Sequence, residues 1–129
     1  MIRKHLEEIP PVRIERQGFF NMTARFALTK DDAVPNYALR VMEFGPRGHT
    51  SLHAHREEHE FYFLDGNAEL VAGDDSATPM CEGDCVYIAP NEPHQLRNTS
   101  NKTMRVVCTI PILAGGDGKQ TTQDTRCGH

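Results

Sequence analysis

Short apolar runs alternate with turn-forming residues along most of the chain, at a spacing of roughly 8–15 residues. This spacing is typical of an all-β sandwich or barrel. Pairs such as Gly45-Pro46 and Asp65-Gly66 are expected to form turns, because glycine accepts positive φ and proline holds φ near the value that turns need. No window of a dozen residues keeps a helical period, although residues 5–9 can form one helical turn. The predicted strands are Thr23–Leu28, Tyr37–Phe44, Ser51–His55, Glu60–Leu64, Ala68–Ala72, Cys85–Ala89, His94–Asn98 and Met104–Ile110.

The chain has 129 residues, a length that suits one domain with a single closed core. We expect the domain to span residues 1–113. Residues 114–129 are rich in glycine and polar side chains, and we expect them to form a flexible tail.

The composition argues against a nucleic-acid or membrane partner. The formal net charge is −4, and the lysines and arginines are scattered instead of gathered in a basic stripe. No apolar run approaches the roughly 18 residues of a membrane span. Residues 1–17 are charged and lack the apolar core of a secretory signal, which favours a cytoplasmic location. We expect reduced thiols without a disulfide framework at Cys81, Cys85, Cys108 and Cys127.

Histidines are concentrated in the middle of the chain. Because side chains alternate along a strand, His53 and His55 are expected to project from the same side of strand 51–55. His59 follows after three residues, and His94 comes from a separate segment. Any one of them can be an ordinary surface histidine. Together, three or four imidazoles form a nitrogen site suited to Mn, Fe, Co, Ni, Cu or Zn.

Two segments resemble the conserved motifs of the cupin superfamily. Residues 48–66 resemble the first motif, with Gly48, the His-x-His pair and Gly66, and residues 83–98 resemble the second, which ends here in His-x-x-x-Asn. The resemblance implies a double-stranded β-helix, the cupin jelly-roll barrel, which is commonly dimeric and holds one metal. The second motif departs from the family pattern, because Glu92 stands where glycine is usual.

The resemblance also implies the ligand set. The family pattern places six residues between the third ligand and the following glycine, and counting back from Gly66 reaches His59 instead of Glu60. Adjacent strand residues face opposite ways, so only one of the two can reach the metal. The implied metal ligands are His53, His55, His59 and His94.

Three further residues are candidates for a catalytic role. Alternation in the last predicted strand places Met104, Val106, Cys108 and Ile110 on its more apolar face. Cys108 is then an interior side chain, either a small apolar filler or a thiol near the metal. Arg40 can bind a carboxylate or enolate if it points inward. Glu92, beside the mouth of the barrel, is a candidate general base.

The resemblance and the nitrogen-rich site predict a dioxygenase or oxidase that acts on a small oxygenated organic substrate, with Mn or Fe as the metal. One alternative is an isomerase, lyase or decarboxylase that uses the metal, Zn or Ni for example, as a Lewis acid. The other is a cupin that binds a small molecule without chemistry. The expected partners are a small-molecule substrate and, from the family, a second copy of the chain in a homodimer.

Overall fold

The computed structural model describes residues 1–121. Cys127 and the second half of the predicted tail, residues 122–129, lie outside the described residues. Within residues 1–121 no helix is long and apolar enough to cross a membrane.

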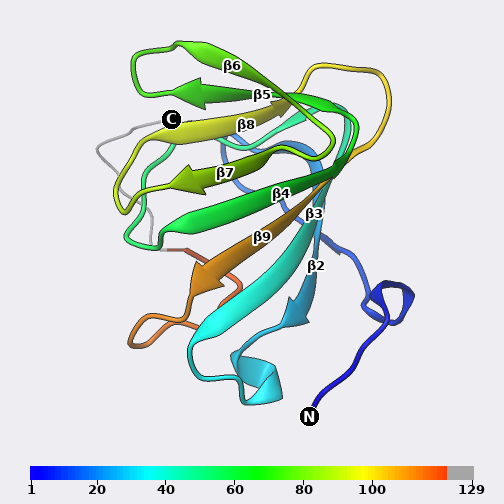
Figure 1. Cartoon of the computed structure of the whole chain (residues 1–129), viewed down its shortest axis with the longest axis vertical. Helices are drawn as coiled ribbons and strands as arrows, with labels where there is room; N and C mark the ends of the chain where they lie inside the picture. The colour runs from blue at the N-terminus through cyan, green and yellow to red at the C-terminus, as the bar shows by residue number, and fades with distance from the viewer. Residues whose placement is uncertain (122–129) are drawn as a thin grey trace.

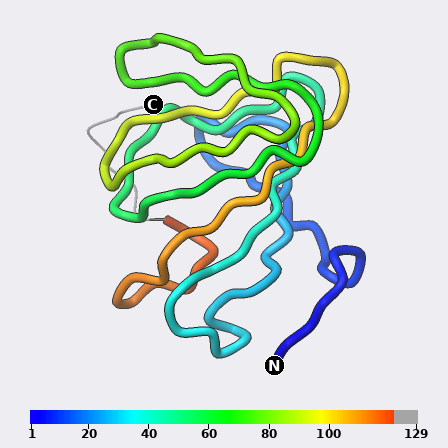
Figure 2. Tube along the Cα trace, in the orientation of Figure 1, coloured from blue at the N-terminus to red at the C-terminus, as the bar shows by residue number. Residues whose placement is uncertain are grey.

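Within the described residues, nine strands form one antiparallel sheet that curls on itself (Figure 1). Its main path runs β6-β5-β8-β3-β9-β4-β7, and β2 pairs with β3 and β1 beside that path. Figure 2 shows β3 and β9, far apart in the sequence, running side by side. The strands are β1 (Val12–Arg13), β2 (Phe20–Leu28), β3 (Tyr37–His49), β4 (His59–Asp65), β5 (Asn67–Ala72), β6 (Ala77–Cys81), β7 (Cys85–Ile88), β8 (His94–Asn98) and β9 (Met104–Pro111).

The all-β prediction and the jelly-roll barrel are confirmed, and seven of the eight predicted strands correspond to β2–β5 and β7–β9. The helical turn expected at residues 5–9 is present as the 3-10 helix η1 (Leu6–Glu8), and a second one, η2, spans Lys30–Asp32. β1 and β6 were not predicted. Both are short and largely exposed, so neither carries the apolar alternation that marks a half-buried strand.

The predicted strand 51–55 is wrong. Those residues form an irregular segment that touches the sheet through one bridge between His53 and His94. The main-chain groups of these two histidines exchange hydrogen bonds of 3.1 and 2.9 Å. The segment therefore lies along β8 without joining its ladder. The expectation that His53 and His55 share a face rested on strand alternation, so their proximity has another cause, the path of this segment across the barrel.

The core lies inside the curled sheet. Alternate residues of β9 are buried, and the same holds for His59, Phe61 and Phe63 in β4. Phe63 is fully buried, and burying an aromatic side chain of this kind contributes about 3 kcal/mol. The two strands pair directly, which brings the interior faces of β4 and β9 together.

A wide bulge in β3 directs the chain toward the histidine segment. Phe20 pairs with His49 and Met22 pairs with Phe44, so residues 45–48 have no partner in β2. The side chain of Asn21 fills the bulge, and its Nδ2 donates to the carbonyl of Pro46 at 3.0 Å. Beyond the bulge, β3 pairs with β8 at its last residue, and the chain then crosses the end of the barrel.

Residues 112–121 return to the barrel. The amide of Lys30 donates to the carbonyl of Asp117 at 3.1 Å, and Lys119 forms an ion pair with Asp31. Gly118 is buried, and a Cβ at this position would lie 2.6 Å from the Cβ of Ala38. The described half of the predicted flexible tail is thus held against η2 by a main-chain hydrogen bond and an ion pair, and Gly118 lies close to Ala38 of β3.

Candidate metal centre

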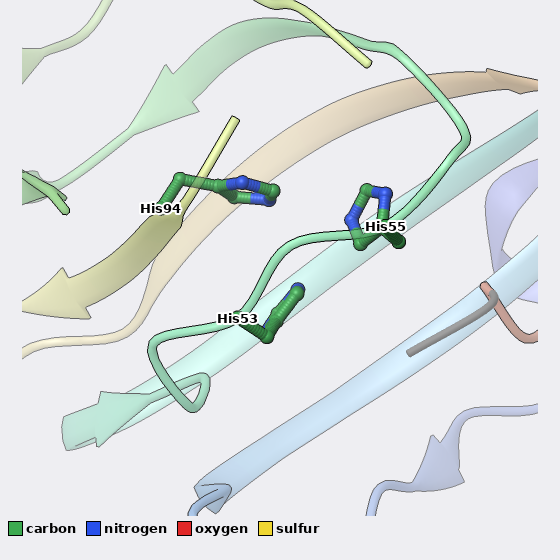
Figure 3. Close-up of side chains that lie close together, drawn as sticks. All are labelled: His53, His55 and His94. Carbon is green, nitrogen blue, oxygen red and sulfur yellow. The ribbon is translucent and has the colours of Figure 1, made fainter. Parts of the chain in front are cut away.

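Three buried imidazoles face a common space inside the barrel (Figure 3). His53, His55 and His94 each offer one ring nitrogen, and these atoms all lie within 4.8 Å of one another. The irregular segment supplies two of the rings and β8 supplies the third. The ring centroids of His53 lie 5.1 Å from His55 and 4.8 Å from His94. Three nitrogen donors at this separation can hold a divalent transition metal.

Main-chain carbonyls orient the three rings. The Nδ1 atoms of His53, His55 and His94 lie 2.9, 2.7 and 2.7 Å from the carbonyl oxygens of Ser51, Glu57 and Glu92. A carbonyl oxygen can only accept, so each Nδ1 carries the proton and each Nε2 keeps a free lone pair. Each histidine thereby presents the tautomer that a metal ion requires, with its orientation fixed by the backbone.

His59 stands beside this group at the start of β4. Its Nε2 lies 2.7 Å from the Nε2 of His55, and its Nδ1 lies 2.9 Å from the sulfur of Cys108. Because the Nδ1 proton of His55 is committed to a carbonyl, the short contact needs either a proton on the Nε2 of His59 or a cation shared by both nitrogens. The donor set therefore fits a metal ion, with three mutually close histidines and a fourth ring next to them.

Burial keeps these histidines neutral. It lowers the pKa of His53 to about 3 and that of His55 to about 4, and the neighbouring His94 adds to both shifts. Burial followed by the charge of Arg40 holds the pKa of His59 well below its ordinary value. The pKa of His94 is also lowered by burial. Four neutral imidazoles in one place are available as ligands at neutral pH.

The remaining walls of the cavity are mostly apolar. The cavity has a volume of about 60 Å³ and opens to solvent. Phe19 stacks on His53 with ring centroids 5.7 Å apart, and the guanidinium of Arg16 lies over the Phe19 ring, 4.6 Å from its centroid. The apolar lining consists of Ile14, Phe19, Met22, Phe26, Met42, Phe44, Phe61 and Leu96.

Arg40 and Cys108 both lie inside the barrel, on the paired strands β3 and β9. Arg40 is 3% exposed and Cys108 is 1% exposed. The Nη2 of Arg40 donates to the Cys108 sulfur at 3.0 Å, and the same sulfur contacts His59. Burial raises the pKa of the thiol, against the opposing effect of the Arg40 charge. The thiol thus links a buried cation to the fourth histidine.

The structure does not bring Glu92 into the cavity. Its side chain is exposed in the turn before β8, where Oε1 accepts the amide proton of Ala89 at 2.9 Å. The carboxylate therefore stabilises the turn, and Glu92 is not among the described residues that line the cavity. In the same turn Asn91 takes a φ of 63°, so asparagine supplies the left-handed conformation that this turn requires. Glu60 is exposed on the opposite face of β4 from His59.

Sequence reasoning missed Arg16 and Phe19. Both residues precede β2 in a stretch without regular structure, and their side chains line the cavity. No periodic pattern surrounds them, and their only sequence signal was an aromatic and a basic residue beside Gly18, which is too common to single out.

Comparisons with known proteins agree with this architecture. Residues 40–110 match the family model described as Cupin domain (Cupin_2). The chain is 30% identical over 59 residues to uncharacterized protein MJ1618 of Methanocaldococcus jannaschii, a match that spans 46% of this chain and 47% of that relative. The chain thus covers about half the length of this curated relative.

Among solved structures, the polyketide cyclase RemF from Streptomyces resistomycificus is similar, with 28% identity and a TM-score of 0.81. That alignment covers 86% of this chain and 79% of RemF. A predicted oxalate decarboxylase from Thermotoga maritima is 23% identical with a TM-score of 0.77, covering 87% of this chain and 100% of the other, and shows the shared fold.

Proposed function

Because the chain belongs to the cupin domain family, we propose that it is a metal-dependent enzyme acting on a small, largely apolar, oxygenated substrate. The observation that carries the proposal is the set of imidazoles whose Nε2 lone pairs face a cavity with apolar walls. His53, His55 and His94 would hold the metal, with His59 as the fourth ligand. When bound, a divalent transition metal supplies Lewis acidity that polarises a carbonyl or stabilises an enolate.

The preferred chemistry is non-oxidative conversion of an enolisable, polyketide-like compound. The similarity to RemF, a polyketide cyclase, supports this choice, and so do the aromatic and methionine side chains of the cavity, which suit a flat carbon skeleton. The chain's own residues orient the substrate against the histidines and exclude water. Phe19 and Phe61 each stack on a histidine ring and form part of the wall beside the reacting atoms.

The dioxygenase predicted first from the sequence becomes the second candidate. The donor set of the cluster is all nitrogen, which suits Fe as well as Zn. The two chemistries differ in one requirement, because a dioxygenase incorporates molecular oxygen and Lewis-acid catalysis does not.

The test begins with the metal content of protein purified without chelators, read as moles of each metal per chain. Aryl 1,3-diketones and longer polyketide-like chains are then incubated with the enzyme under air and under nitrogen, and product masses are recorded. Isomeric or dehydrated products in both atmospheres support Lewis-acid catalysis. Products that gain two oxygen atoms only under air support the dioxygenase. Protein that binds no metal even after reconstitution contradicts both.

Matched histidine variants separate ligand loss from general damage. We expect His53→Ala to lose metal and activity together. His49→Ala is the control, since His49 ends β3 outside the cavity lining and contacts Phe20. His59→Ala should weaken metal binding and Glu60→Ala should not, and the reverse result would contradict the proposed ligand set. Homodimer formation and a cytoplasmic location stay predictions.

A further inference from the structure

We propose that the guanidinium of Arg40 forms an anion subsite in the cavity, which accepts a carboxylate or phenolate carried by an apolar, aromatic-sized body. The inference rests on the proposed function in one respect, because it names the substrate class for the same cavity. Arg40 would be a second polar group that binds the substrate, in addition to the histidine cluster. A substrate would then be held at two polar ends, with its carbon skeleton against the apolar walls.

The first observation is that Arg40 lacks the partner a buried cation normally has. Its Nη2 donates to the sulfur of Cys108, and its Nη1 donates to the main-chain carbonyl of Lys119 at 3.3 Å. Its Nε is buried and has no hydrogen-bond partner within the described residues. No ion pair joins Arg40 to a carboxylate in residues 1–121. An uncompensated buried charge is costly in free energy, so binding of an anion that compensates the charge of Arg40 is favourable.

The second observation is the charge of the cavity. Arg16 and Arg40 both line it, and the cavity lining contains no aspartate or glutamate among the described residues. Lys119 also lines it, but its ammonium group is paired with Asp31. Partial burial and the charge of Arg40 lower the pKa of Arg16. Two guanidinium groups thus repel each other across a cavity to which the described residues contribute no negative charge.

The third observation sets the kind of anion. A guanidinium presents its N–H groups in a planar fork that matches a carboxylate, and a phenolate can accept from the same groups. Phe19, Phe26 and Phe44 line the same cavity as Arg40 and provide aromatic walls. A hydrated inorganic anion gains nothing from such walls, whereas an aromatic acid buries its ring there.

The experiment measures benzoate binding by calorimetry at constant ionic strength, with benzamide as the neutral ligand of the same shape. Wild-type protein is used as purified, with its metal content measured, and again after metal removal. Arg40→Met replaces the cation by an apolar side chain of similar length. The control is Arg97→Met, which removes an arginine that pairs with Glu69 on the half-exposed outer face of β8.

We expect benzoate to bind at least about tenfold more tightly than benzamide, and Arg40→Met to lose at least about tenfold in benzoate affinity while Arg97→Met changes it less than about twofold. The loss should persist in metal-free protein. The ligand-free Arg40→Met variant should unfold at a higher temperature than the wild type, because an unpaired buried charge has been removed. If this variant does not fold, Arg40→Lys, which keeps the charge without the fork, should show the same loss of benzoate affinity.

Benzoate binding that requires the metal and ignores the Arg40 substitutions overturns the subsite, since the carboxylate then binds the metal. Absence of benzoate binding up to its solubility limit also overturns it. Benzoate binding that depends on Arg40 in a protein that never takes up metal supports the subsite and refutes the proposed function alone. The two proposals therefore fail separately.

Discussion

Substitution of Cys108 tests how the fourth histidine is held. The other three cluster histidines receive their Nδ1 partner from a main-chain carbonyl, which no side-chain substitution removes. His59 receives it from the Cys108 sulfur at 2.9 Å. Replacing Cys108 by alanine leaves the His59 ring free to turn and leaves the Nη2 of Arg40 without its acceptor.

The expected effect on metal affinity follows from the role of such outer contacts. Loss of a hydrogen-bond partner behind a metal-bound histidine typically costs about 10–100-fold in affinity. We expect Cys108→Ala to fall in this range. Two buried donors lose a partner, so the variant should also be less stable by about 1–3 kcal/mol. Cys108→Ser keeps an acceptor at nearly the same place and should recover most of the affinity.

The assay is competition between the protein and a chromogenic chelator for Zn²⁺, with the visible spectrum of the Co²⁺-loaded protein as a second measure of ligand geometry. Cys85→Ala is the matched control, because its thiol is exposed on β7 and lies outside the cavity lining. Unchanged affinity and an unchanged Co²⁺ spectrum in Cys108→Ala would refute the reasoning, since His59 would then be held without the thiol or would not bind the metal. Equal loss in the alanine and serine variants would also count against it.

Three further perturbations have expected outcomes. In metal-free protein, acid should destabilise the fold, because the pKa values of His53 and His55 lie below their ordinary value of 6.5, at about 3 and about 4. The unfolded chain then binds more protons, so stability is complete above pH 6.5 and falls as the pH drops, with each histidine costing about 2 kcal/mol at pH 5. Urea unfolding at pH 7.5 and pH 5 measures this, and equal midpoints would contradict it. Asn98→Ala should cost about 2–4 kcal/mol, since the buried amide donates to the carbonyls of Phe44 and Gly45 at the bulge of β3 and to that of Lys102 in the loop before β9; a change below about 0.5 kcal/mol in chemical denaturation would show that these bonds are replaceable. Gly48→Ala should lower the melting temperature and weaken metal binding, because a Cβ would lie 2.4 Å from the carbonyl oxygen of Asn21; a variant that melts and binds Zn²⁺ like the wild type would mean that the bulge tolerates a side chain.

Local patterns in the chain were sufficient for the all-β class and for the buried faces of its strands, whereas the barrel was predicted from the resemblance of residues 48–66 and 83–98 to the cupin motifs. Alternation along the predicted strand Met104–Ile110 marked Cys108 as an interior residue, and it is buried. Alternation along β4 separated His59 from the exposed Glu60. Such patterns succeed because strand geometry ties neighbouring residues to opposite faces, whatever the rest of the chain does.

The environment of the site depends on pairings between distant segments. Arg40 and Cys108 are 68 residues apart and meet because β3 and β9 pair in one particular register. The position of His53 is set by its bridge to His94, in a segment that is not a strand. The strand register and the path of the loops depend on the packing of the whole chain. They cannot be predicted from the local alternation of apolar and polar residues.

The tautomers of the histidines could not be predicted from the sequence either. Spacing identified His53, His55 and His94 as candidate ligands, and the structure brings them together. Their tautomers are fixed by main-chain carbonyl groups. Because every residue has a carbonyl group, the residue types could not indicate which one each histidine would contact. The residue types were enough to predict a metal site. The direction of each lone pair depends on where the folded backbone places a carbonyl acceptor. Arg40 is without an ion-pair partner among the described residues because the fold places no carboxylate beside it.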